Sequence, residues 1–383
     1  MNTMKKKLAA LLAASTCAMP LGSTASAWAQ PAGGELVQQD FENNEPGWGK
    51  FSQPQGAAAQ VGISREAENV HGGAASLQFN YSLQPRQLAA LVLANTTPLS
   101  TANKISFWAK ASAESTMAFA IQERGGGLWT ALFHLPEAKW QQVVLTPGDF
   151  SNSSDLGGKP DADGKLALDS IQWAGIGDFS QFLLADPNSP LLKIFRVTPG
   201  PRTLWLDDVA FDPTKPAPVA AGKPVVVDDF SSPQLGWLGL ADTTIAREER
   251  SVDGAKQPGL ALSYPQSVGK FGGVVRQVNA QGWAGATRLA LSLASSAPAN
   301  IVLQLDERGG GKYLVPIAAA GDGEARALSF GLSQFKPADD SRDDNGKLDM
   351  DQVQRVLVLD AAAVVPGAAR DNTLWIGNIT AQK

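Results

Sequence analysis

Apolar and polar residues alternate along much of this chain with the period of two that is typical of β-strands. In the first half the alternation is clearest in four segments: Lys104–Lys110, Thr116–Ile121, Leu128–His134 and Trp140–Leu145. In the second half it is clearest in five: Arg288–Ala294, Ile301–Leu305, Tyr313–Ile317, Ala325–Phe330 and Val353–Leu359. Segments rich in Gly, Pro, Asn and Ser separate these runs, and no long helical period appears after residue 30. The pattern predicts an all-β fold of short antiparallel strands.

The strand pattern occurs twice, because four landmarks return in the same order. The repeated segments are Asp40–Trp48 and Asp229–Trp237, Glu123–Trp129 and Glu307–Tyr313, Asp161–Asp169 and Asp343–Asp351, and Thr203–Val209 and Thr373–Ile379. Self-similarity at this scale is typical of a duplicated structural unit. We therefore predict two tandem antiparallel β-sandwiches of the jelly-roll type.

A proline-rich segment separates the two copies. Residues 212–224 contain four prolines, which favour an extended and semi-rigid spacer. The predicted domains are accordingly a first β-sandwich over residues 35–211 and a second over residues 225–383.

The first 29 residues have the layout of a secretory signal peptide. Three lysines at positions 5–7 precede the apolar stretch Leu8–Gly22, and Ala27-Trp28-Ala29 offers a small-x-small cleavage site. The only cysteine, Cys17, lies inside this segment, so we expect no disulfide, thiol nucleophile or Cys metal ligand in the mature chain. No later stretch is long and apolar enough for a spanning helix. These features predict a secreted or periplasmic protein without a membrane span.

Charge argues against a nucleic-acid partner. The 383 residues include 37 acidic and 32 basic side chains, for a formal net charge of -5, and no basic run follows the first few residues. Phosphate backbones require a concentrated positive surface, which this chain lacks.

The repeated landmarks also carry a family resemblance. The Asp40–Trp48 opening, the Ile105–Lys110 and Trp140–Val143 strands and the closing Leu204–Val209 strand resemble galactose-binding-like β-sandwich modules. In particular, the segments resemble carbohydrate-binding modules of the family 11 and family 4 type and the related complex I intermediate-associated 30-kDa domains. This resemblance implies a jelly roll with a concave face that often holds a glycan, and a structural calcium ion where the first and last strands meet.

The resemblance places the calcium ligands on three segments of the first copy. They are the carboxylate of Glu42, the turn at Gly72 and the carboxylate of Asp208. Calcium accepts six to eight oxygen ligands, including carbonyls, so two carboxylates and a turn are chemically sufficient. The alternative is that these acids are solvated strand ends. The second copy has Ser231 and Asn378 at the matching positions, and a site there is doubtful.

The Asp161–Asp169 segment and its twin also have metal-like spacing. Asp161 and Asp163 fit the first and third ligands of an EF-hand, but Gly164 comes two residues early and no Glu closes the loop. We therefore prefer a turn in which Asp and Asn side chains accept hydrogen bonds from nearby backbone amides.

Five residues of the first copy are candidates for ligand binding: Trp108, Trp129, Glu123, Arg124 and Trp173. Trp108 has the parity of the polar face of its strand, where an indole can stack on a sugar ring. Glu123 and Arg124 could bind vicinal hydroxyls, or could belong only to a glycine hairpin with a surface ion pair. Trp173 is the weakest candidate, because it shares the parity of Ile171.

The tryptophans that recur have a different interpretation. Trp48 and Trp205 return as Trp237 and Trp375, so we assign these four to the shared core. Trp108 and Trp173 do not recur, which predicts that the first copy binds and that the second serves as scaffold.

We predict a non-catalytic protein that binds a polysaccharide or oligosaccharide. The alternative is a structural or protein-interaction protein of the cell envelope that binds no sugar, since binding modules usually accompany an enzyme. A jelly-roll glycosidase or lyase is a third and weaker alternative. A glycosidase needs two carboxylates flanking one bond, and the lone histidines His71 and His134 complete no catalytic triad.

Overall fold

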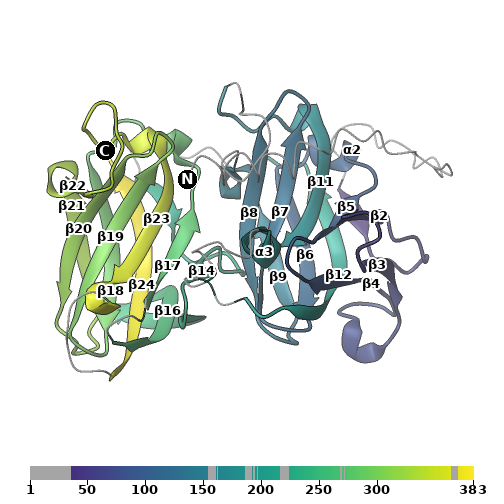
Figure 1. The fold of residues 1–383 in the computed structure, drawn as a ribbon, viewed down its shortest axis with the longest axis horizontal. Helices are drawn as coiled ribbons and strands as arrows, with labels where there is room; N and C mark the ends of the chain where they lie inside the picture. Colours follow the sequence, from purple (N-terminus) through teal and green to yellow (C-terminus); the bar gives the residue numbers. More distant parts are fainter. Residues whose placement is uncertain are drawn as a thin grey trace. The chain divides into compact units, whose positions relative to one another are not determined.

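A computed structural model describes residues 36–153, 161, 163–185, 192, 195, 197–215, 224–267, 270, 272–363 and 370–383. The chain divides into two compact units, the first ending at residue 216 and the second continuing to residue 383 (Figure 1). The predicted signal peptide and residues 216–223 of the predicted linker lie outside the described residues.

The first unit contains two six-stranded antiparallel sheets. Sheet A has the order β3 (Gln60–Ser64), β4 (Ser76–Leu83), β12 (Gly200–Asp212), β6 (Lys104–Ala111) and β9 (Gln141–Leu145), with β1 (Val37–Gln39) paired to β12. Sheet B has the order β10 (Ser151–Asn152), β8 (Leu128–Leu135), β7 (Ser115–Glu123), β11 (Ile171–Asp178), β5 (Leu88–Leu93) and β2 (Trp48–Gln53).

The second unit repeats this arrangement with two further six-stranded sheets. Sheet C has the order β15 (Thr244–Val252), β16 (Ala255–Gln266), β24 (Arg370–Gln382), β18 (Arg288–Ser295) and β21 (Arg326–Gly331), with β13 (Val225–Asp228) paired to β24. Sheet D has the order β14 (Leu238–Gly239), β17 (Gly272–Gln277), β23 (Val353–Asp360), β19 (Ala299–Glu307), β20 (Lys312–Ala319) and β22 (Lys336–Pro337). The predicted fold class, two antiparallel β-sandwiches, is confirmed.

Helices are short wherever the structure describes the chain. They are α2 (Thr97–Ser100), α3 (Ser180–Leu184) and the 3-10 turns η1 (Ala67–Asn69), η2 (Pro147–Asp149), η4 (Leu168–Ser170), η6 (Ala280–Trp283), η7 (Leu332–Gln334), η8 (Met350–Gln352) and η9 (Ala361–Ala363). None of the helices in the described ranges has the length and apolar character needed to cross a bilayer.

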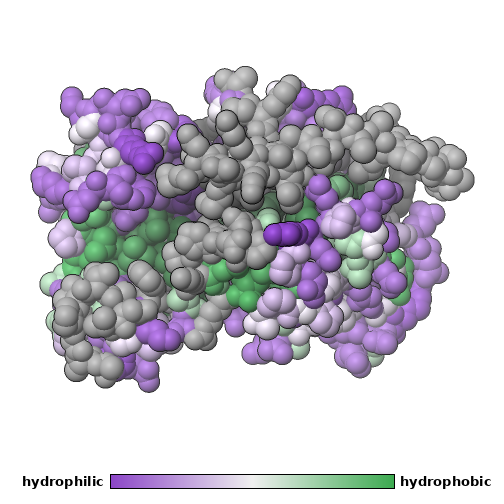
Figure 2. Space-filling model, in the orientation of Figure 1, coloured by the Kyte–Doolittle hydropathy of each residue, from purple (hydrophilic) through white to green (hydrophobic). Residues whose placement is uncertain are grey.

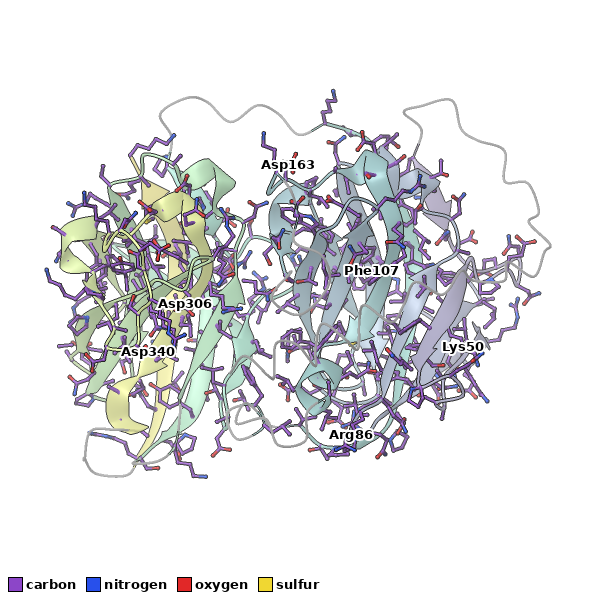
Figure 3. The ribbon with its side chains drawn as sticks, turned by 45° about the horizontal axis from the view of Figure 1, so that its top comes forward. Lys50, Arg86, Phe107, Asp163, Asp306 and Asp340 are labelled. Carbon is purple, nitrogen blue, oxygen red and sulfur yellow. The ribbon has the colours of Figure 1, made fainter. Side chains whose placement is uncertain are left out.

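Alternating side chains form the core of each sandwich, as the period of two predicts. Phe107 and Ala109 of β6 are at most 1% exposed, and Phe107 lies among the strands of the first unit in Figure 3. The hydroxyl of Tyr81 donates to buried Asp178 at 2.9 Å. The twin hydroxyl of Tyr264 donates to Asp360 at 2.8 Å. These matching contacts join the two sheets of each unit and fix the correspondence between the copies.

A bulge interrupts the last long strand of each unit at the same place. The pairing of β12 with β6 shifts register between Asp207 and Ala210. The pairing of β24 with β18 shifts register between the partners of Ala290 and Ser292, which lie on β18. Asp208 and Asn378 have positive φ angles of 50° and 38° at these bulges, a conformation that Asp and Asn tolerate better than most residues. Bulges redirect side chains and are frequent beside functional sites.

Two of the four recurring tryptophans lie in the inter-sheet core, as predicted. Trp48 is 3% exposed and Trp237 is fully buried. Trp375 is also fully buried, in a second small core cluster with Val252, Ala261 and Ala294, whereas the prediction is wrong for Trp205, which is half-buried. Both alternate with inward-facing neighbours, the Leu204–Leu206 and Leu374–Ile376 pairs. Their indoles therefore lie on the outer faces of sheets A and C.

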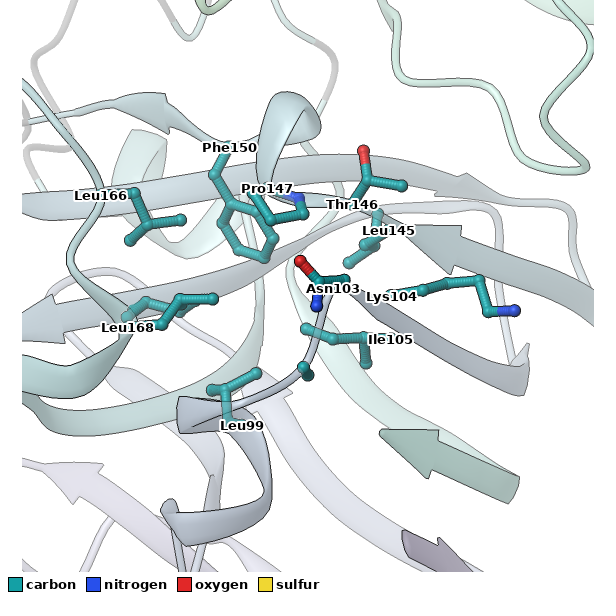
Figure 4. A pocket seen from close by; sticks show the side chains of 12 residues that line it. Leu99, Asn103, Lys104, Ile105, Leu145, Thr146, Pro147, Phe150, Leu166 and Leu168 are labelled. Atoms are coloured by element: carbon teal, nitrogen blue, oxygen red, sulfur yellow. The ribbon is translucent and has the colours of Figure 1, made fainter. Parts of the chain in front are cut away.

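A small apolar gap remains inside the first unit, beside Leu99, Ile105, Phe150 and Leu168 (Figure 4). Its volume is about 10 Å³, which is near the minimum for a single water molecule. This gap is a packing defect of the core and is too small for a ligand.

Candidate functional site

The repeated Glu-Arg-Gly-Gly-Gly string forms the hairpin between β7 and β8. The Glu123 amide donates to the Gly127 carbonyl at 3.1 Å. Gly126 and Gly127 have φ angles of 122° and 92°, which side chains with a Cβ rarely adopt. In the second unit Glu307 and Gly311 form the same bond at 2.8 Å. The structural interpretation of this string, a glycine hairpin, is therefore correct.

Glu123 belongs to this hairpin and is poorly placed for a ligand. Its side chain is 5% exposed, and Oε1 accepts the Ala167 amide at 2.5 Å. Burial raises the pKa of Glu123, and nearby Asp161 adds to that rise. Glu307 accepts the Asp349 amide in the second unit, also at 2.5 Å. The glutamate therefore ties the hairpin to the following loop in both copies, and its predicted contact with a sugar is not supported.

The prediction that Trp129 is a surface stacking platform is wrong. Trp129 is 1% exposed and has the parity of Ala131 and Phe133, which are also buried. Its twin Tyr313 is 2% exposed. An aromatic side chain at this position fills the end of the core beside the hairpin, and a sugar ring cannot reach it.

Trp173 lies on the outer face of sheet B because of a bulge that the sequence did not reveal. The register against β7 shifts between Ile171 and Trp173, so Ile171 pairs with Glu123 and Trp173 pairs with Gln122. Ile171 is 4% exposed, whereas Trp173 is half-buried. Parity with Ile171 was therefore a misleading argument, because a bulge exchanges the two faces of a strand.

Arg124 stands beside Trp173 at the same end of sheet B. Its amide donates to the Ser170 carbonyl at 2.8 Å, and its Nε donates to the Ile171 carbonyl at 3.2 Å. These two bonds hold the exposed guanidinium against β11. Within the described residues its Nη groups make no hydrogen bond, so they can donate to a ligand.

The outer face of sheet B next to Trp173 carries very small side chains. We call Ala118, Ala120, Gly175 and Gly177 the small-residue floor; Gly175 pairs with Ala120 and Gly177 pairs with Ala118 across β11 and β7. On the other side of β11, Gly175 pairs with Val92 of β5 and Gly177 pairs with Ala90 of β5. The floor is therefore a strip of small side chains that crosses several strands, in which Ala118 is 2% exposed and Gly175 is buried.

The matching face of sheet D in the second unit is filled. Asp178 and Asp360 are equivalent, because each accepts a hydrogen bond from the matching tyrosine. The residues three and one positions before them are therefore also equivalent: Gly175 to Leu357, and Gly177 to Leu359. Counting from the shared Glu123 and Glu307, Ala118 corresponds to Val302. Figure 2 shows an apolar area on this face, over β19, β20 and β23. The same fold thus has a recessed face in one copy and a bulky apolar face in the other.

Trp108 lies apart from the other candidates, on the outer face of sheet A. It is half-buried, and the His71 ring stacks on it at 3.9 Å between centroids and 15° between planes. Trp140 meets the edge of His71 at 5.7 Å. The ammonium of Lys110 lies 4.7 Å from the Trp205 ring centroid. One face of Trp108 is therefore covered by a side chain of its own unit.

The predicted calcium residues lie together at the turn of residues 71–75. Oε1 of Glu42 accepts the amides of Ala74 and Ala75 at 2.7 and 3.0 Å. A Cβ at Gly73 would lie 2.2 Å from Glu42 Oε1, and one at Gly72 would lie 3.0 Å from Asp208 Oδ2. Both carboxylates thus flank the glycine turn, as the prediction requires.

Asp207, which the sequence did not single out, supports the same turn. Its Oδ2 accepts the amides of His71 and Gly72 at 2.9 and 3.0 Å, and burial raises its pKa. In the described part of the chain no three His, Cys, Asp or Glu side chains form a metal-binding group. An ion here would therefore need backbone carbonyls in addition to Glu42 and Asp208, which accords with calcium chemistry.

An arginine contacts backbone carbonyls at this place in the second unit. The guanidinium of Arg247 donates to the carbonyls of Phe230 and Ser232. Ser231 and Asn378 stand where the first unit has Glu42 and Asp208. In the first unit Arg65 likewise donates to the carbonyls of Glu42 and Ala74, at 3.3 and 3.4 Å, so an arginine on these carbonyls does not distinguish the two copies.

The two Asp-rich loops form local turns, as we preferred. The Lys165 amide donates to Asp163 Oδ1 at 2.9 Å. The Lys347 amide donates to Asn345 Oδ1 at 2.7 Å. Gly164 and Gly346 have φ angles of 69° and 68°, so both loops adopt the same Asp/Asn-Gly turn.

Comparisons with known proteins give structural neighbours only. No family model matches the chain, and no curated protein matches it. A family 11 carbohydrate-binding module from Clostridium thermocellum, in complex with a β-1,3-1,4-mixed-linked tetrasaccharide, is 15% identical, with 43% of this chain and 97% of that chain covered and a TM-score of 0.33. A tandem of family 22 modules from Paenibacillus barcinonensis is 15% identical, with coverage of 91% and 98% and a TM-score of 0.30. A family 22 xylan-binding domain from the same organism is 17% identical, with coverage of 48% and 97% and a TM-score of 0.30. The neighbours thus include family 11 modules, which the sequence resembles.

Proposed function

We propose that this chain is a non-catalytic polysaccharide-binding protein that acts outside the cytoplasm. Its first unit would hold the glycan on the outer face of sheet B. The observation that carries this proposal is the small-residue floor with Trp173 and Arg124 at one end.

The chemistry of this face suits a polysaccharide. A half-buried indole presents an apolar surface to the C–H face of a sugar ring, and a guanidinium donates to vicinal hydroxyls. The absence of bulky side chains at Ala118, Ala120, Gly175 and Gly177 lets an extended chain lie close to the sheet. Gln53 of β2 adds a buried Oε1 without a hydrogen-bond partner among the described residues.

The test is retention of the full chain in affinity gels that contain mixed-linkage β-glucan or xylan, the ligands named for the structural neighbours. Trp173→Ala and Arg124→Ala should each weaken retention without lowering the melting temperature. Trp108→Ala is the matched control, since it removes an indole from the opposite sheet. Loss of retention in Trp108→Ala alone would instead place the glycan on sheet A.

The same preparations test the remaining parts of the proposal. Release of reducing ends from either polysaccharide would contradict a non-catalytic function. Fractionation of expressing cells should find the chain, shortened near residue 29, in the periplasm or medium.

Calcium binding by the first unit is a separate proposal. Glu42 and Asp208, with carbonyls of the intervening turn, would hold the ion. A bound ion would lock the loop between β3 and β4 against the last strand.

Assembly through protein contacts is the second candidate function. The apolar outer face of sheet D, with Leu357 and Leu359, favours it, because exposed apolar areas commonly mark interaction sites. Sedimentation of the full chain tests self-assembly: a dimer that Leu357→Ser converts to monomer would support it, and a wild-type monomer would refute it.

A further inference from the structure

The second unit has a polar hollow on the outer face of sheet C. Its volume is about 560 Å³, and it is broadly open to solvent. Its polar lining comes from Asp229 and Ser231 after β13, Asp253 at the β15–β16 turn, Lys256 and Gln257 of β16, Ser292 of β18 and Asn378 of β24. No aromatic side chain is among the lining residues.

The hollow exists because side chains that fill the first unit are missing here. Trp108 pairs with Asp207 on the last strand and with Gln142 on β9. Its counterpart Ser292 pairs with Gly377 on the last strand and with Ala327 on β21. A serine, a glycine and an alanine thus replace three larger residues across the sheet.

One polar atom of the hollow lacks a partner. Gln257 Oε1 is buried and accepts no hydrogen bond from the described residues. Buried polar groups are nearly always hydrogen-bonded. This atom points to a ligand that donates a hydrogen bond to it.

The mixture of groups selects the class of ligand. The Gln257 and Asn378 amides and the Ser292 hydroxyl both donate and accept, Lys256 donates, and Asp229 accepts. Asp229 and Asp253 disfavour an anion, and Lys256 lies on the same lining. Sugar hydroxyls donate and accept at the same atom, so a neutral saccharide can form hydrogen bonds with each of these residues.

We infer that this hollow is a second saccharide site, which takes a neutral disaccharide or the end of a neutral glycan. It goes beyond the proposed function because it lies on the other unit and on the sheet that corresponds to sheet A. It also changes the assignment of the second copy from scaffold to binding unit.

The test is isothermal titration calorimetry of the full chain with cellobiose, xylobiose, lactose and maltose. Ser292→Trp fills the hollow with the residue that the first unit has at Trp108, so the fold accommodates this side chain. Ser333→Trp, at an exposed serine of η7 in the same unit, is the matched control. Gln257→Ala removes the buried carbonyl oxygen without adding bulk.

At least one disaccharide should bind wild type and Ser333→Trp equally. Ser292→Trp should weaken binding at least tenfold, and Gln257→Ala should weaken it severalfold. Failure of all four disaccharides to bind wild type would overturn the inference, as would unchanged binding to Gln257→Ala. This second variant decides the matter if Ser292→Trp fails to fold.

Trp173→Ala separates this inference from the proposed function. Disaccharide binding that survives Trp173→Ala supports the hollow even if no polysaccharide is retained by the first unit. Disaccharide binding that disappears with Trp173→Ala and survives Ser292→Trp would overturn the hollow and leave the first unit as the only site.

Discussion

Filling the small-residue floor with a leucine should abolish polysaccharide binding and leave the fold intact. Gly177 is the best position, because Leu359 occupies it in the second unit. A Cβ at Gly177 would meet the Ala89 carbonyl oxygen and Ala90 Cβ at 3.7 Å, which is ordinary van der Waals contact. Glycine is unfavourable in strands, so we expect Gly177→Leu to change the stability of the first unit by no more than about 1 kcal/mol, with either sign.

Binding should respond much more strongly than stability. A leucine side chain would stand in the strip between Trp173 and β5 and keep a sugar chain from the sheet. Loss of that contact should weaken binding at least tenfold, or about 1.4 kcal/mol. Affinity gels and a thermal melt of the same sample measure the two effects.

Gly62→Leu provides the matched control. Gly62 lies on β3 of sheet A, and a Cβ there meets no atom within 4 Å. It should melt and bind as wild type. Equal retention of Gly177→Leu and Gly62→Leu would refute the assignment of the glycan to sheet B.

Three further predictions concern stability. Calcium should raise the melting temperature of the first unit, because an ion that binds only the folded state stabilises that state. Glu42→Gln should remove this rise in melting temperature, and an equal rise in the variant would contradict the assigned ligands. Tyr264→Phe should destabilise the second unit by about 1–3 kcal/mol in urea titrations, because the hydroxyl donates to Asp360 at 2.8 Å and accepts from Asn372 at 3.0 Å; an unchanged midpoint would show that these groups find other partners. Burial raises the pKa of Asp178 in the folded protein above its ordinary value of 3.8. The protonated carboxyl therefore favours the folded state. This contribution to the free energy of unfolding is complete below pH 3.8 and is lost as the pH rises through the pKa of the folded protein. Asp178→Asn should therefore gain stability relative to wild type as pH rises from 3.8, and a difference independent of pH would contradict a raised pKa.

The strand pattern predicted the fold because alternation is a local property. All nine strands expected from periodicity are present, for example β6 at Lys104–Ala111 and β23 at Val353–Asp360. Each expected segment needed only its own residues to reveal one buried face. The pairing order comes from the structure alone, since periodicity by itself does not specify which strands are neighbours.

Site residues were harder to predict because their exposure depends on other segments. Trp205 recurs as Trp375, and recurrence was taken to mean core, yet only Trp375 is fully buried, in a small cluster outside the inter-sheet core. Trp173 was assigned to the wrong face because a bulge reverses parity without a clear signal in the sequence. Trp108 was assigned correctly to an outer face, but the His71 ring that covers it comes from a segment 37 positions away in the chain.

The recessed faces were missed for a different reason. Tryptophans and charged residues attract attention in a sequence, whereas a binding surface can consist of small residues such as Gly175, Gly177 and Ala118. Their significance emerges only when the registers align them with Leu357, Leu359 and Val302. A duplicated chain supplies this comparison internally, because each copy serves as the reference for the other.

Two recessed faces on one chain lead to a last prediction. If the floor of sheet B and the hollow at Ser292 hold parts of the same polysaccharide, binding at one site makes binding at the other intramolecular. Linked sites of this kind commonly gain about 10²–10⁴ in affinity. Trp173→Ala and Ser292→Trp should then each weaken retention on that polysaccharide to the affinity of the one remaining site. The double variant has neither site and should not be retained, and single variants that keep nearly wild-type affinity would show that the two sites act independently.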